Sequence, residues 1–158
     1  MAIKSVFKQW KPRKTSKEDS ILAEHIAKNP GLYFTEVPVG NPGSYPWDSP
    51  SNPRKIDAVK IIGTKSSNHG IFKSGKDIAK LKKVFLAKRI QLIEAKQQLN
   101  RTVIGQLLVA RELFEEQYNP KKISLLTLLN ENITDGALYW VCKNRFNIQV
   151  INQTRAAK

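Results

Sequence analysis

Two acidic residues interrupt apolar stretches of the sequence, and each falls close to a charged or polar boundary. Asp57 lies in RKIDAVKI, residues 54–61, and Glu94 lies in IQLIEAKQ, residues 90–97. Side chains two residues apart in an extended chain project on one face, so Glu94 and Lys96 are expected to meet. A charge at the buried end of a strand is costly unless a metal ion, an opposite charge or a ligand compensates it. A surface ion pair between Glu94 and Lys96 is the simplest interpretation of this motif taken alone.

A third acid strengthens a chemical interpretation. Glu18 precedes the apolar stripe of an expected helix by three and four residues and so shares its inward face. Asp57, Glu94 and Glu18 would supply the carboxylate oxygens that a hard divalent cation prefers, and Lys96 an ammonium that orients or helps to deprotonate water. The backbone carbonyl of Ala95 is a further possible ligand.

The other metal-binding residue types are scarce. Cys142 is the single cysteine, so an internal disulfide and a cysteine-based zinc site are excluded, and the two histidines, His25 and His69, exclude a histidine-rich site. Any metal must be held by oxygen. The expected cofactor is Mg²⁺, with Mn²⁺ able to substitute, and no small-molecule cofactor is expected.

Composition and charge indicate the class of partner. The 158 residues, 41% apolar and 25% charged, suit one domain with a real core. The net charge of +14 attracts polyanions, of which nucleic acid is the commonest for an intracellular protein. The sequence has no apolar stretch long enough to cross a bilayer, and residues 1–14 lack the centre of a secretory signal. We therefore expect a soluble cytoplasmic protein with DNA, and no membrane, as its partner.

The positive charge is concentrated in residues 1–17 and 73–89. These segments are either DNA-binding patches or solvated faces that maintain solubility. The residues expected to contact DNA are Lys11, Arg13, Lys14, Arg54, Lys55, Lys76, Lys80, Lys83 and Arg101.

The spacing of apolar and turn-forming residues predicts alternating helices and strands. Expected helices cover 16–28, capped by Ser16, 76–86, capped by Ser74 and Asp77, 101–117, begun by Thr102, and 134–145. Expected strands cover 32–39, 55–63, 89–96, 122–130 and 147–152. A basic arm, 1–15, is expected to dock through Phe7 and Trp10, a punctuated loop spans 40–53 with Trp47 packing it down, and 153–158 form a frayed tail. The pattern predicts an α/β fold over 16–152, a sandwich with a central mixed sheet flanked by helices on both faces.

The motif residues and the element order resemble the PD-(D/E)XK phosphodiesterase superfamily, which includes many restriction endonucleases, archaeal Holliday-junction resolvases and transposon-end nucleases. The matching positions are Asp57 in RKIDAVKI, Glu94-Ala95-Lys96 in QLIEAK, and Gly105 and Gln106 in TVIGQLLVARELF. Glu18 resembles the first-helix glutamate of resolvase-like members, and the similarity spans about 16–151. Ile56 replaces the proline of the formal motif, and the long gap between Asp57 and Glu94 is interpreted as a basic insertion at about 64–88.

The resemblance implies a restriction-endonuclease-like fold and a magnesium-dependent deoxyribonuclease. Asp57 and Glu94 would bind the metal with the Ala95 carbonyl, Glu18 would support the metal or its water, and Lys96 would help to activate the attacking water. Gln106 would face the site near the scissile phosphate. One site per chain makes a homodimer plausible for cutting a duplex.

Structural interpretations remain open beside the catalytic ones. Glu18 is also suited to a helix N-terminus, Gln106 to a hydrogen bond at a strand end, and Asp57 to an ion pair with Arg54 or Lys55. The alternative function is a basic DNA-binding or assembly protein with the same fold that does not cleave alone.

Overall fold

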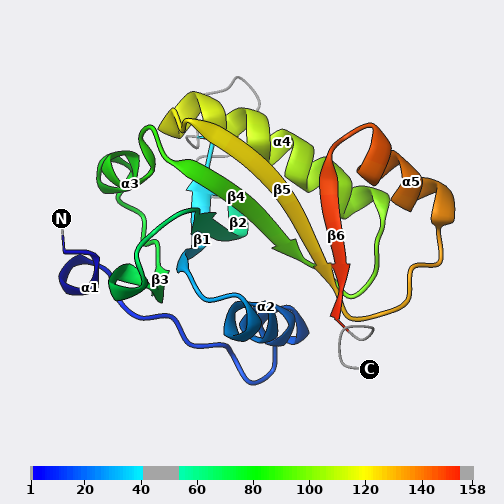
Figure 1. Ribbon diagram of the computed structural model, residues 1–158, viewed down its shortest axis with the longest axis horizontal. Coiled ribbons are helices and arrows are strands. Elements are labelled where there is room, and N and C mark those ends of the chain that lie inside the picture. Colours follow the sequence, from blue (N-terminus) through cyan, green and yellow to red (C-terminus); the bar gives the residue numbers. More distant parts are fainter. Residues whose placement is uncertain (1, 41–53, 154–158) are drawn as a thin grey trace.

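The protein is built on a six-stranded sheet with helices on both faces (Figure 1). The structure, a computed structural model, describes residues 2–40 and 54–153. The predicted α/β sandwich with a central mixed sheet is confirmed. Its elements are α1 (Ile3–Val6), α2 (Lys17–Lys28), β1 (Leu32–Val39), β2 (Arg54–Ile61), η1 (Ser66–Asn68), β3 (Gly70–Lys73), α3 (Ile78–Phe85), β4 (Arg89–Ala95), α4 (Arg101–Tyr118), β5 (Lys122–Leu129), α5 (Gly136–Asn144) and β6 (Ile148–Asn152).

The strands follow the order β3-β1-β2-β4-β5-β6. β2 is antiparallel to both β1 and β4, whereas β4, β5 and β6 are mutually parallel and are joined through α4 and α5. A parallel connection needs such a crossover element, because a tight turn cannot return the chain in the same direction. In this order β2 and β4 occupy the middle of the sheet.

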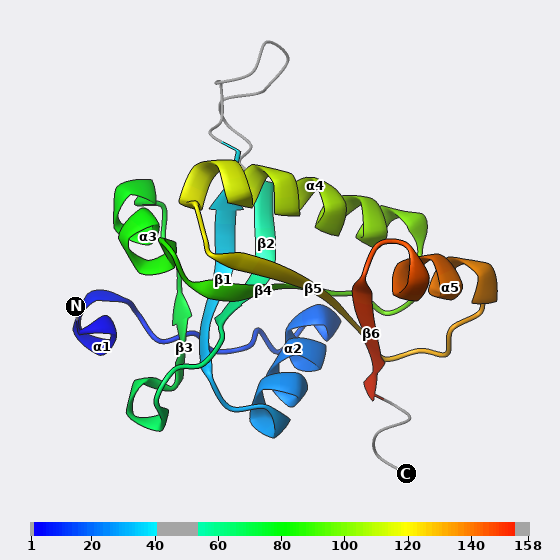
Figure 2. The same ribbon diagram turned by 45° about the horizontal axis from the view of Figure 1, so that its top comes forward.

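The two faces of the sheet carry separate apolar cores. One core receives Leu81 from α3, Phe114 from α4 and Cys142 from α5. The other receives Ile21, Leu22 and Ile26, all from α2. Figure 2 shows α4 above the sheet and α2 below it. The strands that carry Asp57 and Glu94 thus lie between two helical layers.

The end of α4 is fastened to the end of β1. The rings of Phe85, Phe114 and Tyr118 pack together with centroid separations of 4.6–5.2 Å. The Tyr118 hydroxyl donates a hydrogen bond to the carbonyl oxygen of Pro38 at 2.7 Å. α4 is therefore held in a fixed position beside the ends of β1 and β2.

The structure corrects two predicted helix caps. Asn100, rather than Thr102, caps α4 by accepting a hydrogen bond from the Val103 N–H at 2.9 Å. Asp77 caps α3 as predicted, but Ser74 does not, because its hydroxyl donates to the carbonyl of Glu36 at 2.9 Å. The prediction that Ser16 caps α2 is confirmed.

The segment predicted as a basic insertion contributes a strand that was not predicted. β3 pairs in parallel with the first half of β1, from Leu32 to Thr35. Its four residues are too few to show an alternating pattern in the sequence. Pro38 lies beyond this pairing, near the end of β1, as its missing N–H requires.

The N-terminal arm docks on the core, as expected. Phe7 and Trp10 are buried, and Phe7 meets the ring of Phe34 edge-on at 5.0 Å. The backbone N–H of Trp10 donates to the carbonyl of Ile71 at 2.9 Å. These aromatic side chains are therefore committed to packing.

Two predicted segments fall mostly outside the described residues. Of the loop 40–53, only Gly40 is described, and the prediction for Trp47 lies outside the described part. Of the predicted tail 153–158, only Gln153 is described, and it is buried, with its amide donating to the Ile21 carbonyl at 2.6 Å. Residue 153 is thus wrongly assigned to a frayed tail. Within the described part of the chain, no helix combines the length and hydropathy needed to cross a membrane.

Candidate active site

The antiparallel register of β2 and β4 brings Asp57 and Glu94 together. Ala58 pairs with Ile93, and the next residues toward the site are Asp57 on β2 and Glu94 on β4. Glu94 is only 4% exposed. The two acids that the sequence singled out from separate apolar runs are therefore cross-strand neighbours, with Glu94 buried and Asp57 half-buried.

Hydrogen bonds hold the two carboxyl groups in place. Asp57 Oδ2 accepts a hydrogen bond from the Ala95 N–H at 2.8 Å, and the Asp57 and Glu94 carboxyl groups are hydrogen-bonded to each other. Burial and the neighbouring charge of Asp57 raise the pKa of Glu94 to about 9. Burial also raises the pKa of Asp57. Without a cation, the pair is therefore expected to retain a proton at neutral pH.

Lys96 contacts Glu18 rather than Glu94. Its Nζ lies 3.1 Å from Glu18 Oε1. The predicted direct pairing of Glu94 with Lys96 is therefore replaced by an ion pair between Lys96, which follows β4, and Glu18 on α2. Burial lowers the pKa of Lys96, but the hydrogen bond and charge of Glu18, together with the charges of Asp57 and Glu94, outweigh it and leave the pKa raised. Lys96 therefore carries its positive charge next to both buried acids.

Glu18 does not join the carboxyl pair. Within residues 2–40 and 54–153, no group of three or more His, Cys, Asp or Glu side chains is arranged to hold a metal ion. The expected three-carboxylate set is thus reduced to Asp57 and Glu94, with Glu18 oriented toward Lys96. The N–H of Ala95 has a partner in Asp57, and its carbonyl as a ligand stays a prediction.

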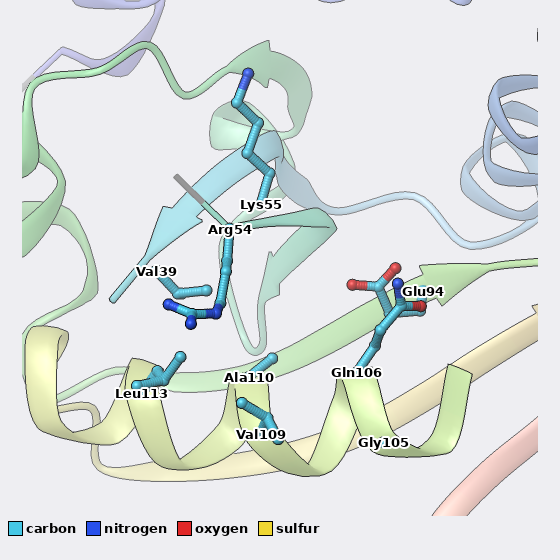
Figure 3. A pocket seen from close by; sticks show the side chains of 9 residues that line it. All are labelled: Val39, Arg54, Lys55, Glu94, Gly105, Gln106, Val109, Ala110 and Leu113. Carbon is cyan, nitrogen blue, oxygen red and sulfur yellow. The ribbon is translucent and has the colours of Figure 1, made fainter. Parts of the chain in front are cut away.

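The carboxyl pair lies between two hollows of the surface. Glu94 and Gln106 line a groove of about 410 Å³ between α4 and the ends of β1 and β2 (Figure 3). Asp57 and Glu18 line a second hollow of about 210 Å³ on the α2 side. Gln106, which is predicted to face the site, therefore lines the same groove as Glu94.

The residues expected to contact DNA divide into two groups. Arg13 is engaged with Asp19, at 3.0 Å, and Lys80 donates to the Val6 carbonyl at 3.0 Å, so both hold the N-terminal arm in place. Burial raises the pKa of Asp19, but hydrogen bonds and the charge of Arg13 outweigh it and leave that pKa lowered. Arg13 is nevertheless exposed, and so are the other predicted residues: Lys11, Lys14, Arg54, Lys55, Lys76, Lys83 and Arg101.

Sequence reasoning missed two polar residues beside the site. Thr127 is the register neighbour of Glu94 on β5, is fully buried, and its hydroxyl has no hydrogen-bond partner among the described residues. It interrupts the apolar run of β5 just as Asp57 interrupts that of β2, so the same signal could have found it. Glu36 lies opposite Asp57 with a φ of 54°, a left-handed conformation that the sequence does not reveal.

Comparison with known proteins adds no relative. No protein-family model, no curated protein and no solved structure matches the chain. The arrangement of the chain's own residues is therefore what indicates its function.

Proposed function

We propose that this protein is a metal-dependent DNA endonuclease that hydrolyses phosphodiester bonds with a PD-(D/E)XK-type site. The observation that carries the proposal is the hydrogen-bonded pair of buried Glu94 and half-buried Asp57, with the Lys96 ammonium beside it. Two buried acids destabilise each other unless a proton or a cation compensates them. A purely structural role leaves this arrangement without an explanation.

The donor set fits a magnesium ion. Mg²⁺ usually takes one or two carboxylates from a protein and keeps several water ligands, so a site with two carboxylates is sufficient. Asp57 and Glu94 would hold the ion. The Thr127 hydroxyl, which has no hydrogen-bond partner within residues 2–40 and 54–153, offers a further polar atom near Glu94. Burial and the charge of Asp57 raise the pKa of Glu94, so the two acids would need such a positive charge beside them to be ionised together.

The chain's own residues would position the other reactants. A divalent cation supplies Lewis-acid chemistry, since it stabilises negative charge on phosphate oxygens and lowers the pKa of water. Lys96, held by Glu18, would donate hydrogen bonds to the attacking water or to a phosphate oxygen and would stabilise developing negative charge. Gln106 would donate to the phosphate backbone from the α4 side.

The charge distribution supports DNA as the substrate. The net charge of +14 favours a polyanion, and Arg54 lines the groove beside Glu94 while Arg13 lines the hollow beside Asp57. Lys55 lines both hollows next to that pair. One centre per chain cuts one strand at a time, so cutting both strands of a duplex would need a second copy, and a homodimer belongs to the proposal.

The test is conversion of supercoiled plasmid in Mg²⁺ or Mn²⁺ by wild type, Asp57→Ala and Glu94→Ala. We expect each substitution to reduce cleavage by about a hundredfold or more, as loss of a central electrostatic group does. Glu24→Ala is the matched control, because Glu24 is an exposed acid paired with Lys28 on the outside of α2. Equal cleavage by wild type and both site variants would refute the proposal. Binding without cleavage, with a steep dependence on salt, would support the non-cleaving DNA-binding protein instead.

A further inference from the structure

The groove that contains Glu94 and Gln106 extends along α4 away from the carboxyl pair. We call it the α4 groove; its lining is Val39, Arg54, Lys55, Glu94, Gly105, Gln106, Val109, Ala110 and Leu113. In Figure 3 the side chain of Arg54 extends toward α4, whereas that of Lys55 points away from it. One end of the groove is therefore the candidate active site, and the wall opposite α4 carries positive charge.

Gly105 has no reason within the described chain to be a glycine. It lies inside α4, where glycine is less favourable than alanine because of its conformational entropy. A Cβ atom placed on Gly105 would meet nothing within 4 Å. The backbone of α4 is thus bare at the point where the groove meets Gln106. A bare backbone of this kind permits close approach by a bound molecule.

The floor of the groove combines apolar contact with positive charge. Val109 is 53% exposed, one of few large apolar side chains on the described surface, and Leu113 lies one turn further along α4. The guanidinium of Arg54 faces this apolar strip. The combination matches a nucleotide, which has an apolar base face and an anionic phosphate.

We propose that the α4 groove binds an unpaired nucleotide next to the bond to be cleaved, with its backbone closest to Gly105 and its base against Val109. In a duplex the base faces are stacked and the sugar–phosphate backbone lies outside, so only an unpaired nucleotide presents an apolar face to Val109 and Leu113. This inference rests on the proposed function, because it places the reacting phosphate at Asp57 and Glu94. It assigns the substrate to the class of DNA with single-stranded gaps, flaps or frayed ends.

The test compares binding of two fluorescein-labelled DNAs in the presence of a chelator, which prevents cleavage. One is a fully paired duplex and the other is the same duplex with a short single-stranded gap. We expect wild type to bind the gapped DNA more tightly. We expect Gly105→Ala to weaken binding of the gapped DNA about tenfold, as a methyl group in a close contact does, and to change binding of the paired duplex little.

The chain offers a matched control for each substitution. Gly136 is also a helical glycine whose added Cβ would meet nothing within 4 Å, so Gly136→Ala should bind both DNAs as wild type does. Leu86 is 54% exposed and lies outside the groove, so Leu86→Ser controls for Val109→Ser. Val109→Ser should reduce the preference for gapped DNA about fivefold, as loss of part of one base contact does. Circular dichroism verifies folding, and if Gly105→Ala is misfolded, Val109→Ser decides the question.

The outcomes separate this inference from the proposed function. Equal affinity of wild type for both DNAs, or equal behaviour of Gly105→Ala and Gly136→Ala, would overturn the inference even if plasmid is cleaved. A preference for gapped DNA that is lost in the groove variants would uphold the groove even if wild type cleaves nothing.

Discussion

The carboxyl group of Glu94 is hydrogen-bonded to that of Asp57 across the adjacent strands β4 and β2. The backbone N–H of Ala95 donates to the same Asp57 side chain at 2.8 Å. These contacts favour an ionised Asp57 that accepts and a protonated Glu94 that donates. The proton on Glu94 compensates the negative charge of the pair, which a bound cation would otherwise compensate.

The first prediction concerns the pH dependence of stability without metal. The pKa of Glu94 rises from 4.5 to about 9 on folding, mainly through burial and then the charge of Asp57. Between these pH values the folded state binds more protons than the unfolded state, so the free energy of unfolding falls as pH rises. For this one group the slope is at most about 1.4 kcal/mol per pH unit.

Urea denaturation in chelator, over a series of pH values from about 5 to 9 that lies between the two pKa values, measures this slope. Glu94→Gln removes the titrating group and should flatten the profile. A wild-type profile that is already flat, or that rises with pH, would contradict the assigned protonation of Glu94.

The second prediction concerns a divalent cation. Mn²⁺ at neutral pH should displace the shared proton and raise the melting temperature of wild type. At about a hundred times the dissociation constant, the expected stabilisation is about 2.7 kcal/mol. Asp57→Asn and Glu94→Gln should lose this stabilisation, and Glu24→Gln should keep it, since Glu24 pairs with Lys28 on the surface. An equal Mn²⁺ effect in all four proteins would place the cation elsewhere.

The third prediction concerns Thr127, whose buried hydroxyl has no partner among the described residues. Thr127→Val keeps the shape of the side chain and removes an unsatisfied polar group, so in chelator the variant should be as stable as wild type or more stable by about 1 kcal/mol. If the hydroxyl serves the cation or its water, the Mn²⁺-induced increase in melting temperature should shrink. Thr35→Val is the control, because the buried Thr35 hydroxyl donates to the Phe72 carbonyl at 3.5 Å and does not neighbour Glu94. An unchanged Mn²⁺ effect in Thr127→Val would assign Thr127 to packing alone.

Periodicity predicted the main elements and the two buried acids, because both depend on local contrasts between apolar and polar residues. This contrast predicted the α/β sandwich, the helix from Ser16 and the strands around Asp57 and Glu94. It did not predict the partner of Lys96. Alternation within one strand indicated Glu94, but β4 ends at Ala95, and α2 brings Glu18 to Lys96 from the other side of the sheet. Such choices depend on tertiary distances that one sequence does not encode locally.

The structural roles of charged residues could not be predicted from the sequence for the same reason. A lysine-rich segment shows its charge but not which ammonium groups have protein partners. Arg13 and Lys80 were counted with the DNA-binding residues, and both contact neighbouring groups of the protein. The aromatic residues of the arm, in contrast, were correctly expected to dock, since large apolar side chains gain most from burial.

The last prediction distinguishes the structural role of Lys80 from the surface charge of its neighbours on α3. Lys80 donates to the Val6 carbonyl at 3.0 Å, and its ammonium lies 4.7 Å from the centroid of the Phe7 ring. Lys80→Met removes both contacts and should lower the free energy of unfolding by about 1–2 kcal/mol, the sum of a hydrogen bond and a cation–π contact. Lys82 is exposed in the same helix, so Lys82→Met removes the same charge and should change stability by less than about 0.5 kcal/mol. Urea denaturation of the two variants measures the difference. Equal stability would mean that the contacts of Lys80 do not help to hold the N-terminal arm. A larger loss of DNA binding in Lys80→Met than in Lys82→Met would return Lys80 to the DNA-binding residues.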